Sequence, residues 1–188
     1  PKWVGRCNQC GKFGTVGTEP TAITRQTHHT ASNLAGATVS LSDHISETPA
    51  RRLATGWVEV DRVLGGGLAA STVILLTGEP GVGKSTLLLG LAERCSGSVL
   101  YASGEESVEQ VANRLKRLGL KGKNISFTNE VDINTVIATA RQLSPILLVI
   151  DSLQAIRASE GAGNLGSPTQ VKMILSELVA LAKETSMA

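Results

Sequence analysis

The residues with the clearest chemistry lie between positions 78 and 86. Residues 78–85 fit the phosphate-loop pattern GxxxxGK[ST], which follows an apolar run and precedes a helical pattern. Glycines let the backbone N–H groups turn towards phosphates, Lys84 can reach the β and γ phosphates, and the Ser85 hydroxyl is a ligand for Mg²⁺. We therefore predict a nucleoside triphosphate site that consists of Gly78, Glu79, Pro80, Gly81, Val82, Gly83, Lys84, Ser85 and Thr86.

Carboxylates follow two other apolar runs. Asp151 directly follows one run, a position from which such folds hold Mg²⁺. Glu105 and Glu106 follow the other, where a carboxylate can polarise the water that attacks the γ-phosphate. Glu105 is nearer the strand end and is the predicted base, whereas Glu106 is predicted to be a surface or interface residue. The alternatives are a turn-capping role for Asp151 and an acidic first helical turn for the two glutamates.

Alternating strands and helices must position these groups. Short apolar runs predict strands over residues 72–77, 98–103, 124–128 and 146–150. Helices are expected from residue 86 and after the caps Ser107, Asp132 and Ser167. This alternation predicts an α/β fold with a parallel, helix-covered sheet. Because parallel strands end on one side, the acidic groups should face the phosphate loop.

The buried face of the last helix can also be predicted. Its apolar spacing is expected to bury Val171, Ile174, Leu175, Leu178 and Val179.

Composition limits the classes of protein that fit. The 188 residues are 41% hydrophobic, enough for one α/β domain with a small appendage. Only two Trp, one Tyr and two Phe occur, which excludes a mainly aromatic platform for single strands. The net charge of +2 does not require a polyanionic partner. With no apolar stretch of membrane-spanning length, no secretory signal pattern and three cysteines, we predict a soluble cytoplasmic protein without membrane association.

The composition changes twice along the chain. Residues 1–14 carry Cys7 and Cys10, residues 15–50 form a Thr/Ser-rich linker, and regular periodicity extends over residues 51–188. The linker histidines lack metal-ligand spacing and are predicted to be solvated. Cys95 is predicted to be a small core residue.

Several segments together resemble a known family. Residues 53–68 contain Thr-Gly-Trp and Asp-Arg-Val-Leu-Gly-Gly-Gly, and residues 101–107 read Tyr-Ala-Ser-Gly-Glu-Glu-Ser. With the phosphate loop and residues 149–152, they resemble the bacterial RadA (Sms) family of RecA-like DNA repair and recombination ATPases. The resemblance implies a RecA-like P-loop ATPase core that uses ATP and Mg²⁺. It places catalytic roles on Lys84, Glu105 and Asp151, with Ser85 and Asp151 serving Mg²⁺.

The resemblance also concerns the two ends of the chain. Residues 1–11 are similar to the second half of a four-cysteine zinc module, so Cys7 and Cys10 are half of a Zn²⁺ site that the full-length protein would complete. Family members continue beyond the position of Ala188 with another strand and a further domain, so this chain is expected to be a fragment. The family implies a ring of six subunits around DNA, with a trans-acting cation from that missing segment.

The partners implied by the resemblance are DNA and a recombinase. Single-stranded and branched DNA are the expected substrates, and a RecA-type recombinase is the expected protein partner. RecA-like proteins place a DNA-binding loop where residues 157–167 lie, and glycine-rich backbone with one arginine suits phosphate contact. A plain connecting loop is the alternative. The residues predicted to contact DNA are Arg157, Gly161, Gly163 and Asn164.

A second basic segment follows the helix that starts after Ser107. Its cations are favoured by the helix dipole, so a solvated face is predicted in preference to a DNA site. These residues are Arg114, Lys116, Arg117, Lys121 and Lys123.

Four function classes follow from these observations. The first is an ATP-driven DNA motor that processes recombination intermediates by branch migration or helicase-like action. The second is a RecA-like ATPase of the KaiC type that acts on a protein substrate. A small-molecule kinase is less compatible, because the chain lacks an acceptor site and lid arginines. The fourth class is a purely structural nucleotide-binding module, in which loss of Glu105 would change nothing.

Overall fold

The computed structural model describes residues 40, 42, 52–158 and 164–188. The chain divides into two units, residues 1–46 and 47–188. In the first unit the hydroxyl groups of Ser40 and Ser42 form a hydrogen bond of 2.5 Å. The predicted zinc module, with Cys7 and Cys10, and the histidines of the linker lie outside the described residues. The division into segments 1–14, 15–50 and 51–188 therefore stays a prediction.

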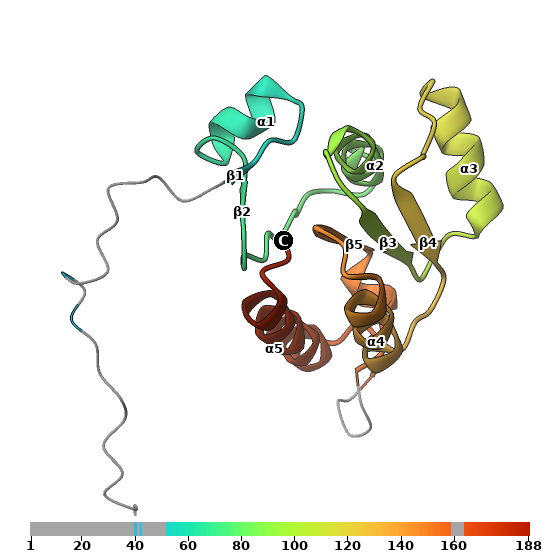
Figure 1. Cartoon of the computed structure of the whole chain (residues 1–188). Helices are drawn as coiled ribbons and strands as arrows, with labels where there is room; N and C mark the ends of the chain where they lie inside the picture. The colour runs from blue at the N-terminus through green and yellow to red at the C-terminus, as the bar shows by residue number, and fades with distance from the viewer. Residues whose placement is uncertain (1–39, 41, 43–51, 159–163) are drawn as a thin grey trace, which may run out of the picture. The chain divides into compact units, whose positions relative to one another are not determined.

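A parallel sheet forms the centre of the second unit (Figure 1). Strand β3 (Val99–Ser103) lies between β4 (Ile125–Thr128) and β5 (Leu147–Asp151). In the register, Tyr101 pairs with Phe127 on one side and with Val149 on the other. These three strands match the predicted segments to within one residue, and the predicted parallel sheet is confirmed.

Two helices cover one face of this sheet. Helix α2 (Lys84–Arg94) follows the phosphate loop, and α3 (Val108–Arg117) connects β3 to β4. Their apolar side chains pack against alternate residues of the strands, as the two-residue side-chain period of a strand requires. This core includes Leu89, Ala92, Cys95, Val99, Tyr101, Val111, Leu147 and Val149. Cys95 is buried there as predicted, and burial raises the pKa of its thiol.

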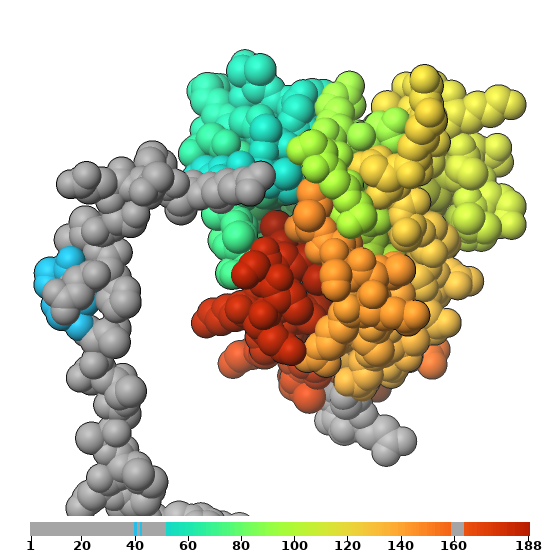
Figure 2. Space-filling view, viewed as in Figure 1, coloured from blue at the N-terminus to red at the C-terminus, as the bar shows by residue number. Residues whose placement is uncertain are grey.

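The opposite face carries α4 (Ile133–Leu143) and α5 (Pro168–Thr185), whose surfaces are contiguous in the space-filling view (Figure 2, orange and red). The inner face of α4 is buried at Ile133, Val136, Ile137 and Ala140. This second core includes Leu100, Ile133, Ile137, Ala140, Ile174, Leu178 and Leu181. The prediction for α5 is confirmed at Ile174 and Leu178, but Val171 and Leu175 are only half-buried. It is wrong at Val179, which is 39% exposed, because the buried stripe of this helix passes through Gln170 and Leu181 instead. Among the described residues, no helix is long and apolar enough to span a membrane.

Side-chain caps fix the ends of these helices. The predicted cap Ser107 forms a capping box with Gln110 at α3, and Asp132 accepts a hydrogen bond of 3.0 Å from the Thr135 N–H at α4. Ser167 caps α5, where Pro168 occupies the first turn. At the end of α2 the Asn124 amide lies 2.8–3.2 Å from the carbonyl oxygens of residues 92, 95 and 97. The C-terminal end of the helix that follows the phosphate loop is therefore tied to the start of β4.

The segment before the phosphate loop packs against α2. Strands β1 (Arg52–Leu53) and β2 (Leu68–Ala69) form a small antiparallel pair around α1 (Val58–Val63). Trp57 lies so close to Gly90 that a Cβ at Gly90 would be 2.9 Å from its ring. The Arg94 guanidinium lies 4.5 Å from the centre of the Trp57 ring, a cation–π contact. Glycine at position 90 therefore permits the Thr-Gly-Trp segment to dock on α2.

The strand predicted over residues 72–77 is absent from the structure. No strand is assigned there, and the side chains of residues 73–76 are 38–55% exposed. A strand needs a hydrogen-bonding neighbour, and the edge of β5 is occupied by the last residue of the chain. The Leu148 N–H donates to the Ala188 carbonyl at 2.9 Å, and the Ala188 N–H donates to the Ile146 carbonyl at 3.1 Å. Apolar sequence alone therefore did not suffice for pairing.

Candidate active site

The phosphate loop lies between the exposed segment 72–77 and helix α2. Its residues 78–83 are exposed, and Lys84 is the first residue of the helix. The Lys84 ammonium donates hydrogen bonds of 2.8 Å to the carbonyl oxygens of Gly78 and Glu79. An ammonium has three donors, so the lysine bridges the start of the loop and keeps one N–H for another partner.

The N-terminus of α2 carries no side-chain cap. The cap residue is Gly83, with a φ of +99°, and Gly81 has a φ of +81°. Residues other than glycine rarely adopt such φ values. The first N–H groups of a helix have no intrahelical acceptor. The sequence therefore leaves these N–H groups to an external acceptor, and the helix dipole favours an anion there.

Asp151 ends β5, where it pairs in register with Ser103. Its Oδ2 accepts a hydrogen bond of 2.7 Å from the hydroxyl of the buried Tyr101. Burial, and then the hydrogen bond to Asp151, raise the pKa of Tyr101 far above its ordinary value, so the hydroxyl remains a donor at neutral pH. The carboxylate of Asp151 is therefore oriented by a neutral group.

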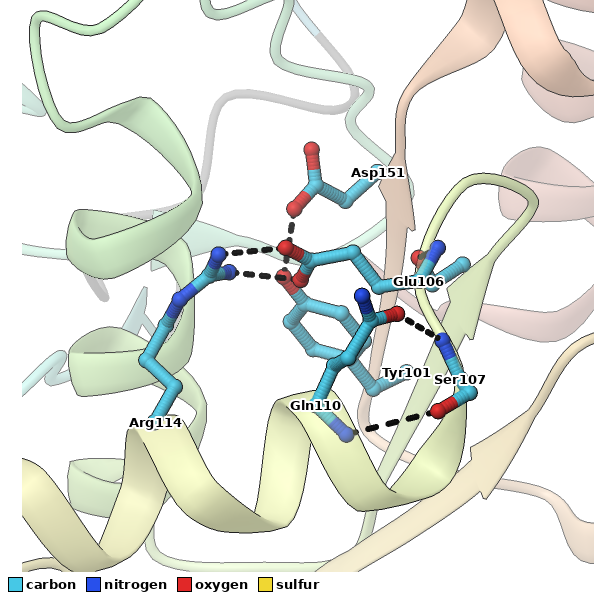
Figure 3. A network of polar contacts seen from close by, with 7 residues as sticks. Tyr101, Glu106, Ser107, Gln110, Arg114 and Asp151 are labelled. Carbon is cyan, nitrogen blue, oxygen red and sulfur yellow. Dashed lines mark hydrogen bonds and ion pairs between the residues drawn. The ribbon is translucent and has the colours of Figure 1, made fainter.

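The two adjacent glutamates have different partners. Glu105 is exposed, and its Oε1 accepts a hydrogen bond from the Ser152 hydroxyl, directly after β5. Glu106 is half-buried and forms a two-pronged ion pair with Arg114 of α3, with one contact at 2.7 Å (Figure 3). Glu105 and Asp151 thus lie at the same end of neighbouring strands, whereas the charge of Glu106 is balanced by the Arg114 guanidinium.

Several known proteins have sequences similar to this chain. The family model described as an AAA domain matches residues 38–188. The chain is 40% identical over 189 residues to the DNA repair protein RadA of Mycolicibacterium smegmatis, and 39% identical over 194 residues to that of Pseudomonas aeruginosa. The chain belongs to the AAA-domain family as a RadA-type member.

The similarity covers 97% and 100% of the RadA-type chain but only 41% and 42% of these two relatives. The chain thus spans about two fifths of their length. A crystal structure of a KaiC-like protein from Pyrococcus horikoshii matches with a TM-score of 0.61 and 21% identity, over 74% of this chain and 70% of that one. This match supports the RecA-like α/β core and concerns the fold alone.

Three partners in the site of this RadA-type chain were not predicted from the sequence. All three depend on tertiary contacts. They are the hydrogen bond from Tyr101 to Asp151, the hydrogen bond from Ser152 to Glu105, and the ion pair between Arg114 and Glu106. The sequence predicts a solvated side chain for Arg114, and this prediction is wrong because the side chain is only 20% exposed. The one available signal was its position, two helical turns after Glu106.

The segment predicted to contact DNA is described only at its ends. Gly161 and Gly163 lie outside the described residues. The side chain of Arg157 is exposed, while its backbone bonds to Val131 and Ile133. The buried Gln170 donates to the Ile156 carbonyl at 2.9 Å and accepts from the Gly166 N–H at 2.8 Å. One buried amide therefore holds both ends of this segment together.

Proposed function

We propose that this chain is the ATP-hydrolysing core of a DNA repair and recombination motor. The observation that carries the proposal is that Glu105 and Asp151 lie at the same end of the sheet, and that each carboxylate accepts a hydrogen bond from a neighbouring hydroxyl group. A phosphate loop with an uncapped helix N-terminus supplies the other half of such a site. The RadA relatives support DNA repair as the process.

In the proposed reaction, residues 78–86 hold the triphosphate. The N–H groups at the start of α2 bind phosphate oxygens, and Lys84 exchanges its carbonyl partners for the β and γ phosphates. This exchange is feasible because both lysine contacts are to neutral acceptors on an exposed loop. The charge that develops on the γ-phosphate is then stabilised by Lys84.

The donor set fits Mg²⁺. Among the described residues the Tyr101 hydroxyl donates to Oδ2 of Asp151, and no donor to Oδ1 is found. Carboxylate and hydroxyl oxygens are the ligands this hard cation prefers, and Ser85 and Asp151 would hold it. When bound, Mg²⁺ would neutralise charge on the β and γ phosphates.

Glu105 is the proposed general base. It accepts the proton of the attacking water through the carboxylate whose Oε1 is held by Ser152. Glu106 cannot take this role while Arg114 occupies both of its oxygens. The ion pair therefore favours Glu105 as the base.

Single-stranded and branched DNA are the proposed substrates, and residues 157–167 are proposed to contact the phosphate backbone. Arg157 and Asn164 are both exposed at the described ends of this segment. Gly161 and Gly163 would add backbone contacts. We also propose that the active form is a ring of six subunits, in which a neighbouring subunit supplies a cation to the site. A RecA-type recombinase is the proposed protein partner. Zn²⁺ would be held in part by Cys7 and Cys10.

The decisive experiment measures ATP hydrolysis by the protein with and without single-stranded DNA. Stimulation by DNA is expected, and Arg157→Ala should reduce it without changing the basal rate. Lys123→Ala, which removes an exposed charge elsewhere, is the matched control. Hydrolysis that responds to no DNA would contradict the DNA motor and favour an ATPase acting on a protein.

The ring can be tested separately by the concentration dependence of turnover. If a neighbouring subunit supplies a cation, the rate per subunit should rise as the protein assembles. A rate per subunit that is independent of concentration, from a species that remains a monomer, would overturn the trans-acting mechanism.

A further inference from the structure

Tyr101 lies at the junction of the core and the candidate active site. Its side chain is fully buried, and its hydroxyl is 2.7 Å from Oδ2 of Asp151 (Figure 3). Tyr101 pairs with Val149 across the sheet, and Asp151 lies two residues further along β5. Residues two apart on a strand share a face, so the tyrosine reaches along the sheet to the carboxylate.

The ring of Tyr101 is held on its other side. It stacks on Phe127 of β4, with ring centres 6.5 Å apart and planes at 18°. The ring also belongs to the core under α2 and α3, with Leu89 and Val111 among its members. A hydroxyl on a ring fixed in this way has a defined position before any ligand arrives, so little conformational entropy is lost on using it.

The partners of the nearby carboxylates differ in charge. Arg114 neutralises Glu106. A cation on Asp151 would compete with Mg²⁺ for the same charge, whereas a hydroxyl orients the carboxylate and leaves the charge in place. Among the described residues Tyr101 is the one hydrogen-bond donor to the Asp151 carboxylate, and its hydroxyl bonds to Oδ2 and not to Oδ1.

We propose that Tyr101 is a positioning residue for the metal site: its hydroxyl fixes the rotation of the Asp151 carboxylate and leaves Oδ1 to Mg²⁺. This inference rests on the proposed function, in which Asp151 serves Mg²⁺. The competing explanation is structural, since a buried tyrosine hydroxyl needs an acceptor whatever the acceptor does.

Tyr101→Phe separates the two explanations because it keeps the ring and removes only the hydroxyl. The probe is a non-hydrolysable fluorescent ATP analogue, whose affinity is measured with Mg²⁺ and with EDTA. We expect the gain in affinity on adding Mg²⁺ to fall about threefold to tenfold, the range that corresponds to the net contribution of one ordinary hydrogen bond. Affinity in EDTA should not change. An unchanged gain would overturn the inference.

Two further variants make the outcome decisive. Ile174→Val disturbs the core on the opposite face of the sheet and leaves the Tyr101 ring in place, so it should lower stability and leave the Mg²⁺ gain intact. An equal loss of the Mg²⁺ gain in Ile174→Val would show a structural effect and overturn the positioning role. Asp151→Asn should lose most of the gain. If it does not, the proposed role of Asp151 fails, whatever the result for Tyr101.

Discussion

The two halves of the candidate site are built in opposite ways. The phosphate loop is exposed, has no side-chain cap, and is bridged by Lys84. The carboxylates at the ends of β3 and β5 are each held by another side chain, through Tyr101, Ser152 and Arg114. Both halves contact the same nucleotide in the proposed reaction.

The difference follows from what each half must recognise. Phosphates bind to backbone N–H groups, which must remain unsatisfied until the ligand arrives. A base and a metal ligand must instead point in one direction beforehand, and only packed neighbours can fix a side chain in this way. Variants in the loop should therefore affect nucleotide binding itself, and variants among the carboxylates should affect the Mg²⁺ dependence of binding, the reaction or stability.

The largest effect is expected from Lys84→Ala. No other described cation reaches the loop, so nucleotide binding with Mg²⁺ or hydrolysis should be lost. Hydrolysis is measured by phosphate release and binding by a fluorescent ATP analogue. Hydrolysis at the wild-type rate in this variant would show that the phosphate loop is not part of the active site.

Glu105→Gln should lower hydrolysis about 10²-fold or more while nucleotide affinity stays near that of the wild type, because the amide keeps the shape and removes the base. Single-turnover hydrolysis and equilibrium binding together measure the two quantities. Glu106→Gln is the matched control and should retain most of the rate. If the two variants exchange these results, the base is Glu106 and the ion pair with Arg114 opens during the reaction.

Gly83→Ala tests whether backbone geometry alone prepares the loop. A Cβ at this position would contact nothing within 4 Å, so the variant adds only backbone strain at a φ of +99°. Strain of about 1–2 kcal/mol should weaken nucleotide binding roughly tenfold. Gly119→Ala is the control, because Gly119 also has a positive φ and no Cβ contact but follows α3. Equal losses of affinity in both variants would contradict a local effect.

The smallest effect on the reaction is expected from Arg114→Met. The change leaves the half-buried Glu106 without its partner, which should cost about 1–2 kcal/mol of unfolding free energy, measured by urea denaturation. Hydrolysis should change only a fewfold. The double variant with Glu106→Gln should recover part of the stability. A large loss of hydrolysis at full stability would instead give Arg114 a part in the reaction.

Much of this architecture was predictable because local rules determine it. Strand and helix periodicity located β3, β4 and β5, and serine or aspartate caps located the starts of α3, α4 and α5. The phosphate loop was readable because its function depends on glycine backbone and one lysine at fixed spacing. Each of these signals acts within a few residues of the chain.

Only the tertiary structure decided the remaining features. The apolar segment 72–77 satisfied every local criterion for a strand, yet the edge of β5 is bonded to Ala188. Position in the sequence favours Glu105 over Glu106, but the physical basis of this difference is the ion pair to Arg114, eight residues along the chain from Glu106. Tyr101 and Asp151 are 50 residues apart in sequence. Spacing determines which residue types are present, whereas strand register and packing determine which of them meet.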